Sequence, residues 1–420
     1  MKRHLIGIGG VGMSALATAL VRLGDEVTGA DRTLGTPNIR FLESLGIRVF
    51  PDDGSGIDAK TDEVIVSTAI EATNPGLILA KELGLPVTHR AKALARALEG
   101  HRLVAVVGTC GKSTVTAMLG HVLAECGFDP FCVNGANVPG WEGAVRFGRG
   151  EFAVAEVDES DKSLVAFRPY AAIVTNASAD HYSKEEMDEV FDAFIKDLPG
   201  PLVDGRVMPS TGDRQSPAAV DGNRILEVET SIPGRHNRQN AALALRMAMA
   251  LGCDEARARA ALLSFRGVER RLQRIGSAGN SAPAVYDDYA HNPEKLRAMW
   301  TTLAEKYAGG LCVIWRPHGY APLRKMMDAL VTMFRETIRP QDRLLLLPVY
   351  DAGGTTDRSV NSDALARLIA ERVTLVADLD AAYDWCAAHC GDFAAFVTCG
   401  ARDPGLPLLA RRLSPIPGAA

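Results

Sequence analysis

The sequence predicts an α/β protein of three domains, each built on a mostly parallel sheet covered by helices. Short apolar runs typical of buried strands alternate with longer helix-like segments along nearly the whole chain, a rhythm that produces parallel sheets. Two glycine-rich turns directly follow such runs, as in nucleotide-binding α/β folds. The length of 420 residues exceeds what one ordinary hydrophobic core serves, so more than one domain is expected.

The expected strands follow from the apolar runs, and the domain boundaries from breaks in the alternation. In chain order, the expected strands are Leu5–Ile8, Glu26–Thr28, Glu63–Ser67, Leu103–Val107, Phe152–Ala155, Ala171–Val174, Ala284–Tyr286, Cys312–Trp315, Leu344–Val349, Val373–Ala377 and Ala395–Thr398. Breaks near residues 99–102 and 265–269 divide the chain into predicted domains 1–98, 99–265 and 266–420. Residues 198–232 are rich in Pro, Gly, Asp and Ser, so an irregular region is expected there.

Composition and charge exclude several classes of protein. The net charge of −5 and the lack of a basic run argue against a nucleic-acid partner. No apolar run approaches about eighteen residues, which argues against a membrane-spanning helix. Residues 1–4 lead straight into a strand rather than into a cleavable signal segment. A cytoplasmic location is therefore expected.

The cysteines, 8 in number, are scattered along the chain. They are expected to be reduced core residues, because most lie in apolar runs and none shows the paired spacing of a metal site. Cys386, His389 and Cys390 form the one group that invites a metal interpretation. On a helix, however, these side chains are expected to share one packed face.

The segment from Gly108 to Ser113, Gly-Thr-Cys-Gly-Lys-Ser, is the first candidate functional motif. It follows an apolar run and precedes the helix-like stretch Thr114–Ala124, so backbone N–H groups and the helix dipole can hold a phosphate. Lys112 supplies a cation and Ser113 a hydroxyl for Mg²⁺. The common pattern has a further glycine where this chain has Val106, and a chance loop is the alternative. Together with the rest of the chain, the loop predicts a site for ATP and magnesium.

A second glycine turn lies near the start of the chain, between a strand-like run and a helix-like segment. Gly7, Gly9 and Gly12 satisfy the dinucleotide-binding pattern, and Asp31 follows about twenty residues later, where such folds place an acid that binds ribose. A nicotinamide cofactor is the ordinary interpretation. The separate triphosphate loop favours a diphosphate-sugar nucleotide instead, because a hydride-transferring enzyme needs no second phosphate site. The candidate binding residues here are Gly9, Gly10, Val11, Gly12 and Asp31.

Polar clusters follow two predicted strands of the middle domain, at residues 155–161 and 175–181. In open α/β sheets ligands bind beyond the carboxyl ends of the strands, so both clusters are candidates for a site beside the phosphate loop. Glu156 and His181 can complete a magnesium shell with Ser113, since Mg²⁺ keeps several waters and takes few protein ligands. The alternative for the acidic cluster is a solvated turn.

Two further polar clusters lie at residues 233–240, which open an alanine-rich helix, and at residues 286–293, which close a strand. Their amide and imidazole groups can hydrogen-bond a base or orient a phosphate. For either cluster alone a helix cap is the better interpretation, because Asn237 and Asp288 are ordinary capping residues.

Taken together and in this order, the motifs resemble those of the Mur ligases, ATP-dependent enzymes that add amino acids to the UDP-N-acetylmuramoyl precursor of peptidoglycan. The resemblance covers nearly the whole chain and implies residues for three roles. For ATP it implies Gly108, Thr109, Gly111, Lys112, Ser113, Thr114, His236, Asn237, Asn240, Asp288 and His291; for magnesium, Ser113, Glu156 and His181; for catalysis, Lys112, Glu156, His181 and Arg270, the last approaching the phosphates.

The opening glycine turn and residues 67–70, 133–135 and 158–161 are similar to the branch of this family that holds UDP-N-acetylmuramate:L-alanine ligase and the murein tripeptide ligase. The similarity implies a Rossmann-like first domain for the UDP-sugar, with Ser67 and Asn134 among its binding residues. It also implies a central P-loop ATPase-type domain and a Rossmann-like third domain for the amino acid or peptide. The implied partners are small molecules, without nucleic acid or membrane, and the chain is expected to be a monomer or homodimer.

The implied activity is amide formation through an acyl phosphate, in which ATP phosphorylates a carboxylate and an amine then displaces the phosphate. We expect UDP-N-acetylmuramate and L-alanine, or a related amine, as substrates in peptidoglycan precursor synthesis. One alternative is a related ligase for a recycled murein tripeptide or for a metabolite outside the cell wall. Another is a non-catalytic nucleotide-binding paralogue. A third alternative, a nicotinamide-dependent oxidoreductase, is supported by the first glycine turn alone.

Several positions depart from the family pattern. Cys110 stands in the phosphate loop where a histidine is common, and the span between residues 181 and 234 is short, so the central domain is expected to be shortened. In the third domain Gly319 and Pro322 occupy the places of two arginines suited to an amino-acid carboxylate. Arg316 or Arg324 is the expected substitute. The segment 399–403, Cys-Gly-Ala-Arg-Asp, also departs from the glycine-rich end expected there.

Overall fold

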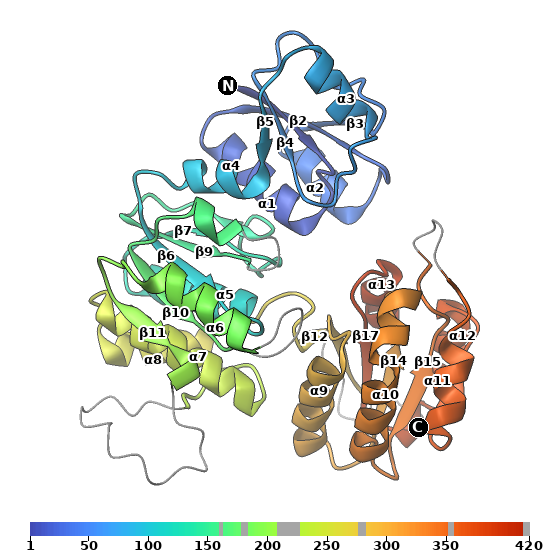
Figure 1. Cartoon of the computed structure of the whole chain (residues 1–420). Coiled ribbons are helices and arrows are strands. Elements are labelled where there is room, and N and C mark those ends of the chain that lie inside the picture. Colours follow the sequence, from blue (N-terminus) through green and yellow to red (C-terminus); the bar gives the residue numbers. More distant parts are fainter. Residues whose placement is uncertain (159–162, 178–183, 208–226, 276–282, 352–356, 415–420) are drawn as a thin grey trace. The chain divides into compact units, whose positions relative to one another are not determined.

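The computed structural model describes residues 1–158, 163–177, 184–207, 227–275, 283–351 and 357–414. The chain divides into two compact units: unit 1 comprises Met1–Ser231 and Asn237–Gly267, and unit 2 comprises Ile232–His236 and Val268–Ala420. Three sheets organise the described residues, two in unit 1 and one in unit 2 (Figure 1). No helix in the described ranges is long and apolar enough to span a membrane.

The first sheet of unit 1 has five strands in the order β3-β2-β1-β4-β5, all parallel. They are β1 (Lys2–Ile6), β2 (Glu26–Asp31), β3 (Arg48–Pro51), β4 (Glu63–Val66) and β5 (Val87–His89). The helices are α1 (Val11–Arg22), α2 (Pro37–Ser44), α3 (Pro75–Glu82) and α4 (Arg90–Ala97). Because the strand order reverses at β1, the turn after this strand is a topological switch point, where such sheets bind ligands.

The second sheet of unit 1 has the order β11-β10-β6-β9-β7-β8 and is parallel except for β8. Its strands are β6 (Arg102–Val107), β7 (Phe131–Val133), β8 (Val145–Arg146), β9 (Phe152–Glu156), β10 (Ala171–Val174) and β11 (Leu202–Asp204). Its helices are α5 (Lys112–Glu125), α6 (Lys184–Ile195), α7 (Arg235–Ala250) and α8 (Glu255–Ser264), with short 3₁₀ turns η1 (Ser163–Ala166) and η2 (Gly205–Val207). The phosphate loop follows β6, a central strand buried on both faces.

The two sheets of unit 1 share one hydrophobic core. A single cluster of buried side chains includes Leu16 of α1, Leu94 of α4, Phe131 of β7 and Phe191 of α6. The opposite face of the first sheet is covered by α3, whose Leu77 packs in a separate small cluster. Removing this much apolar surface from water couples the two sheets into one unit.

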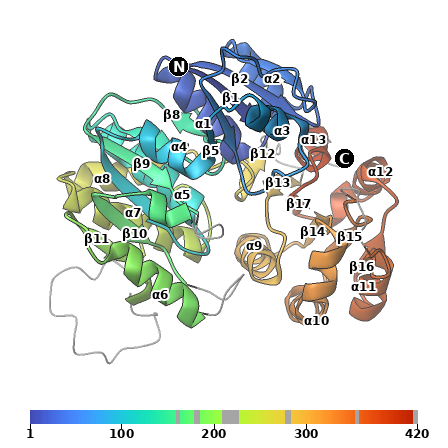
Figure 2. The same cartoon turned by 45° about the horizontal axis from the view of Figure 1, so that its top comes forward.

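The sheet of unit 2 has the order β12-β13-β17-β14-β15-β16 and is parallel except for β12. Its strands are β12 (Gln273–Ile275), β13 (Ala284–Asp288), β14 (Leu311–Trp315), β15 (Arg343–Leu346), β16 (Val373–Leu375) and β17 (Ala395–Cys399). Its helices are α9 (Pro293–Lys306), α10 (Tyr320–Thr337), α11 (Ser362–Ile369), α12 (Leu379–Ala388) and α13 (Gly405–Leu413), with the 3₁₀ turn η3 (Cys390–Asp392). Helices α9, α10 and α11 pack on one face, and α12 and α13 pack on the other (Figure 2).

The predicted α/β class is confirmed, and each expected strand overlaps an observed one. The first ends earlier than expected, at Ile6, because Gly7 takes a positive φ of 75°. The strands that were not expected are short or lie near sheet edges: β3, β5, β7, β8, β11 and β12. Such strands bury less and carry a weaker apolar signal. One of them, β11, lies in the region expected to be irregular.

Six of the eight cysteines are buried, as the sequence predicts, whereas Cys110 and Cys126 are only partly buried. None of the eight is in a disulfide, and Cys386 and Cys390 are buried in the core against α13. His389 stacks on Trp385 with ring centroids 3.9 Å apart. Among the described residues, no group of three or more His, Cys, Asp or Glu side chains is arranged to hold a metal ion.

Asp342 is a buried acceptor that links three elements of unit 2. It accepts hydrogen bonds from the indole N–H of Trp300 at 2.8 Å and from the backbone N–H of Leu311 at 2.9 Å, and it pairs with Arg339 at 2.9 Å. We expect Asp342→Ala to lower the free energy of unfolding of unit 2 by about 2–4 kcal/mol, because the buried donors lose their acceptor.

Urea unfolding followed by tryptophan fluorescence measures this change, since Trp300, Trp315 and Trp385 all lie in unit 2. Asp380→Ala is the control: its pair with Arg412 is exposed, and its loss should cost at most about 0.5 kcal/mol. An equal loss of unfolding free energy in both variants would contradict the role of Asp342 as a stabilising buried acceptor.

Candidate functional site

The first glycine turn joins β1 to α1 at the switch point of the first sheet. Gly9 donates its backbone N–H to Asp31 Oδ2 at 2.9 Å, and a side chain at position 9 would collide with that carboxylate. Asn38 donates to the Gly9 carbonyl at 3.0 Å. Gly10 is the N-cap residue of α1, and the adjacent Val11 is 41% exposed although it is apolar. Asp31 therefore fixes the turn through the Gly9 N–H, while Val11 at the start of α1 stays exposed to solvent.

Two further residues border this turn. Ser67 follows β4, the neighbour of β1, and therefore lies at the same edge of the sheet. Arg90 is a residue that the sequence did not single out. It begins α4, and its Nη1 lies 3.1 Å from where a Cβ on Gly12 would be. The same guanidinium lies 3.8 Å from Asp158 Oδ2, which follows β9 of the second sheet. Arg90 therefore adds a positive charge to the space between the two glycine loops.

The phosphate loop is braced by the side chains that follow β10. Asn176 Oδ1 accepts hydrogen bonds from the Thr109 hydroxyl at 2.7 Å and from the Cys110 N–H at 3.0 Å. Its amide nitrogen donates to the Cys110 carbonyl at 2.9 Å, and the Thr175 hydroxyl donates to the same carbonyl at 2.6 Å. Sequence reasoning placed the segment near the site but missed the role of Asn176, because only the pairing of β6 with β10 reveals it.

Glycine is required at both ends of the loop. Gly108 has φ 128° and Gly111 has φ 85°, which side-chain-bearing residues rarely adopt. A Cβ on Gly108 would lie 2.1 Å from Thr175 Oγ1, and one on Gly111 would lie 2.7 Å from Asn240 Oδ1. The second contact shows that Asn240 of α7 lies directly against the loop.

Lys112 and Ser113 open α5. The Lys112 ammonium donates to the Gly108 carbonyl at 2.6 Å and lies 3.9 Å from Asp158 Oδ1. Ser113 and Thr114 are buried in the first turn of the helix. Cation, hydroxyls and helix N-terminus therefore converge at one place, the arrangement that binds phosphate oxygens.

Glu156 ends β9, beside the phosphate-loop strand. Its Oε2 accepts the Gly135 N–H at 2.8 Å, and a side chain at position 135 would overlap the carboxylate. The adjacent Asn134 is buried, and its Oδ1 has no hydrogen-bond partner among the residues that the structure describes. His181, the other predicted magnesium ligand, lies outside the described residues.

Neither Asn237 nor Asp288 is a helix cap, although the cluster at residues 286–293 does cap a helix, through Asn292. Helix α7 begins at Arg235, so Asn237 is buried inside the helix and cannot cap it. The N-cap of α9 is Asn292, whose side chain accepts from the Lys295 N–H. Asn237 and Asn240 belong to unit 1, with a 3.4 Å contact between their amides, whereas His236 belongs to unit 2.

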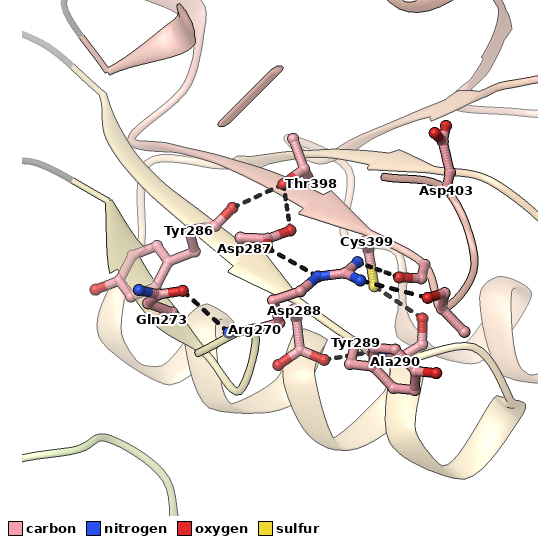
Figure 3. A network of polar contacts seen from close by, with 12 residues as sticks. Arg270, Gln273, Tyr286, Asp287, Asp288, Tyr289, Ala290, Thr398, Cys399 and Asp403 are labelled. Atoms are coloured by element: carbon pink, nitrogen blue, oxygen red, sulfur yellow. Dashed lines mark hydrogen bonds and ion pairs between the residues drawn. The ribbon is translucent and has the colours of Figure 1, made fainter. Parts of the chain in front are cut away.

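Arg270 is the centre of a polar network in unit 2 (Figure 3). Its Nε pairs with Asp287 Oδ2 at 3.1 Å, and its two Nη atoms donate to the carbonyls of Gly400 and Ala401. Thr398 donates to the other Asp287 oxygen at 2.8 Å. The network ties the turn before β12 to the ends of β13 and β17.

Burial controls the titration of this network. It raises the pKa of Asp287 to about 6, although Arg270 and Thr398 act in the opposite direction. Burial also raises the pKa of Asp288, which accepts the N–H groups of Leu272 and Ala290 and thereby holds the turn around it. The pKa of His291 is lowered to about 4, mainly by burial and further by Lys295.

The two arginines expected to bind an amino-acid carboxylate are engaged elsewhere. Arg316 pairs with Asp403 at 2.5 Å and donates to the Pro348 carbonyl at 3.2 Å. Arg324 pairs with Asp357 at 2.7 Å. Neither guanidinium is therefore held ready for a further anion in this structure.

Comparison with known proteins supplies independent findings. The model described as Mur ligase family, catalytic domain, matches residues 2–102, and the model described as Mur ligase, glutamate ligase domain, matches residues 270–402. The chain is 37% identical over 390 residues to UDP-N-acetylmuramate–L-alanine ligase of Paenarthrobacter aurescens, covering 83% of each chain. It is 32% identical over 403 residues to the protein of that name from Solidesulfovibrio magneticus, covering 87% of each.

Solved structures show the same architecture. The UDP-N-acetylmuramate-alanine ligase of Thermotoga maritima superposes with a TM-score of 0.83 at 26% identity, covering 98% of each chain. A murein peptide ligase of Psychrobacter arcticus shares the fold with a TM-score of 0.65 at 21% identity, again over 98% of each chain.

Removal of the Asn176 amide should loosen the phosphate loop. We expect Asn176→Ala to weaken ATP binding about tenfold, because three hydrogen bonds to Thr109 and Cys110 are lost. Isothermal titration with ATP and MgCl₂ measures the affinity. The control is Asn361→Ala, which removes the N-cap of α11 in unit 2. Unchanged affinity in Asn176→Ala would show that the loop keeps its shape without the amide.

The raised pKa of Asp287 predicts how the stability of unit 2 depends on pH. A carboxyl group whose folded pKa exceeds its unfolded value binds more protons in the folded state. Its contribution to stability is therefore fully present below pH 3.8 and is lost as the pH rises through about 6.

Between about pH 4 and pH 7 we expect the wild type to lose up to roughly 3 kcal/mol relative to Asp287→Asn, which cannot ionise. Urea unfolding of both proteins across this range measures the difference. Parallel stability curves would contradict a raised pKa.

Proposed function

The chain belongs to the Mur ligase family, and on this premise we propose that it joins L-alanine to UDP-N-acetylmuramate at the expense of ATP. The relatives whose names state this reaction match most of the chain. The observation that carries the proposal is the braced phosphate loop with Lys112 at its centre. A nucleotide-binding paralogue without activity would have no need for a lysine so placed.

The proposed reaction has two steps. A carboxylate oxygen of the muramoyl group attacks the γ-phosphorus of ATP, the bond to the bridging oxygen breaks, and ADP leaves. The amine of L-alanine then attacks the acyl carbon of the acyl phosphate, inorganic phosphate leaves, and the nitrogen loses a proton. Lys112 and the N–H groups of the loop stabilise the charge that spreads over the phosphoryl oxygens.

Magnesium fits the donors present at the loop. The Ser113 hydroxyl and the Glu156 carboxylate are oxygen donors, which Mg²⁺ prefers, and it completes its shell with water and phosphate oxygens. We propose these two residues and His181 as its holders; when bound, the ion would neutralise charge on the transferred phosphoryl group. The Gly135 N–H holds the Glu156 carboxylate in position by donating a hydrogen bond to it.

The first glycine turn is the proposed site of the UDP-sugar. Gly9, Gly10, Val11 and Gly12 offer backbone N–H groups at a helix N-terminus, and Asp31 fixes the turn. The predicted role of Arg270 at the phosphates stays a prediction, because within unit 2 its guanidinium binds Asp287 and two carbonyls. We place the reaction in the cytoplasm, in keeping with eight cysteines outside any disulfide.

The test is the formation of an amide from UDP-N-acetylmuramate, L-alanine and ATP, followed by mass spectrometry together with phosphate release. Phosphate release should require both the acid and the amine. We expect Lys112→Ala to lower kcat/KM about 10²–10³-fold, because charge on the phosphoryl group loses its cation.

Lys81→Ala is the matched control, since this lysine is exposed on α3 of the same unit. Product formation that survives Lys112→Ala would remove the loop from the mechanism. A wild type that binds ATP but makes no amide would favour the non-catalytic paralogue.

A further inference from the structure

Two cysteines of unit 1 lie in turns that end helices. Cys126 directly follows α5, and Cys253 lies in the turn between α7 and α8. A glycine with positive φ adjoins each of them: Gly127 has φ 92° and Gly252 has φ 102°. Such a glycine turns the chain sharply away from the helix that it follows. Both thiols are therefore carried by tight turns rather than by the helices themselves.

Contacts on both sides of the cysteines hold these two turns together. Arg257 of α8 donates a hydrogen bond from Nη2 to the carbonyl of Glu125, the last residue of α5, at 2.8 Å. A Cβ on Gly252 would lie 3.8 Å from Phe128 Cζ, which is ordinary van der Waals contact. Helix α8 also packs against α5. Each cysteine is thus flanked by residues that contact the turn of the other.

The two thiols lie against each other and differ in their exposure to solvent. Burial raises the pKa of Cys253 to about 12, and a hydrogen bond with the Cys126 thiol acts in the same direction, whereas the charge of Arg257 lowers this pKa. Cys253 is 8% exposed, and Cys126 is more accessible. The pair therefore combines a sulfur that a dissolved reagent can reach with a buried partner sulfur.

A second thiol pair, in unit 2, differs from the first in its burial. A hydrogen bond with Cys386 adds to the effect of burial in raising the pKa of Cys312. Both of these cysteines lie in the core between the sheet and α12, with 0% exposure. Because the oxidation of a thiol depends on its accessibility, this pair is an internal control for the first.

We propose that Cys126 and Cys253 form a site of reversible oxidation, at which hydrogen peroxide converts the two thiols into a disulfide. The Cys126 sulfur attacks an oxygen of the peroxide, the O–O bond breaks, and a sulfenic acid and water result. The Cys253 sulfur then attacks the sulfenic sulfur, the S–O bond breaks, and a second water leaves. The two thiols lose two electrons and two protons to the peroxide, and a dithiol reductant reverses the change.

The disulfide would join the ends of α5 and α7 that lie away from the phosphate loop. Helix α5 begins at Lys112 and has 14 residues, so it is about 21 Å long. Asn240, which lies against the loop, is likewise near the start of α7. We therefore expect the disulfide to leave the loop in place and to stabilise unit 1, because it closes a long loop of the unfolded chain.

Peptide mapping of the full chain tests the proposal. The reduced protein is treated with hydrogen peroxide, unfolded, alkylated with iodoacetamide and digested with trypsin without reductant. We expect mass spectrometry to show residues 113–146 joined to residues 247–257, and dithiothreitol to release the two peptides. Cys312 and Cys386 should both be recovered alkylated.

Matched variants identify the sulfur atoms. The peptide of residues 113–146 also contains Cys132, which is fully buried on β7. We expect Cys132→Ala to keep the crosslink, and Cys126→Ser and Cys253→Ser each to abolish it. Oxidation of Cys126 to a sulfinic acid alone, a disulfide to a different cysteine or to a second chain, or a crosslink that persists in Cys126→Ser would overturn the proposal.

Differential scanning calorimetry measures the expected stabilisation. The unfolding midpoint of unit 1 should rise by about 5 °C or more after oxidation of the wild type, and dithiothreitol should return it to its first value. Peroxide should not raise the midpoint of Cys253→Ser. Isothermal titration should give an ATP affinity within about twofold of that of the reduced protein. A disulfide that forms without raising the midpoint would overturn its stabilising role.

Discussion

The parallel direction of the strands is the constraint on which the candidate sites depend. In a parallel sheet all carboxyl ends lie at one edge, so residues far apart in sequence meet there without further arrangement. In unit 1 this places Asn176, after β10, against the loop that follows β6, and Glu156 after the adjacent β9. In unit 2 it gathers the residues after β13, β14 and β17. The helices that return the chain cover the faces and leave this edge open.

A second requirement is that the loops at this edge keep their shape. A phosphate loop aims several backbone N–H groups at one point, and such groups cannot pair with one another. Asn176 and Thr175 satisfy the opposite side of the loop, so its geometry is set before a ligand arrives. Because the loop is already ordered, ligand binding loses less conformational entropy, and the affinity is higher. In unit 2 the buried Asp288 likewise fixes the surrounding turns, because its carboxylate accepts hydrogen bonds from two of their N–H groups.

The sequence predicts the parts of the fold and site that depend on local pattern. Central strands such as β6 and β14 are continuous apolar runs, and Gly108, Lys112 and Ser113 form a motif whose spacing alone indicates phosphate binding. The sequence does not predict the edge strands or the residues that hold the loops in place. The roles of Asn176, Arg90 and Asp287 arise from strand pairing and from side-chain contacts between distant segments. The capping assignments of Asn237 and Asp288 failed because helix boundaries shift by a few residues with tertiary packing.

Unit 2 is not a continuous stretch of chain. Residues 232–236 belong to it while the segments on either side belong to unit 1, and Gly234 lies so close to α9 that an added Cβ would be 2.8 Å from Thr302 Oγ1. The polypeptide therefore passes from one unit to the other three times. A single cut near residue 268, by a protease or in the gene, leaves the C-terminal fragment without the piece that packs on α9. Independent expression of unit 2 calls for those five residues to be supplied as well.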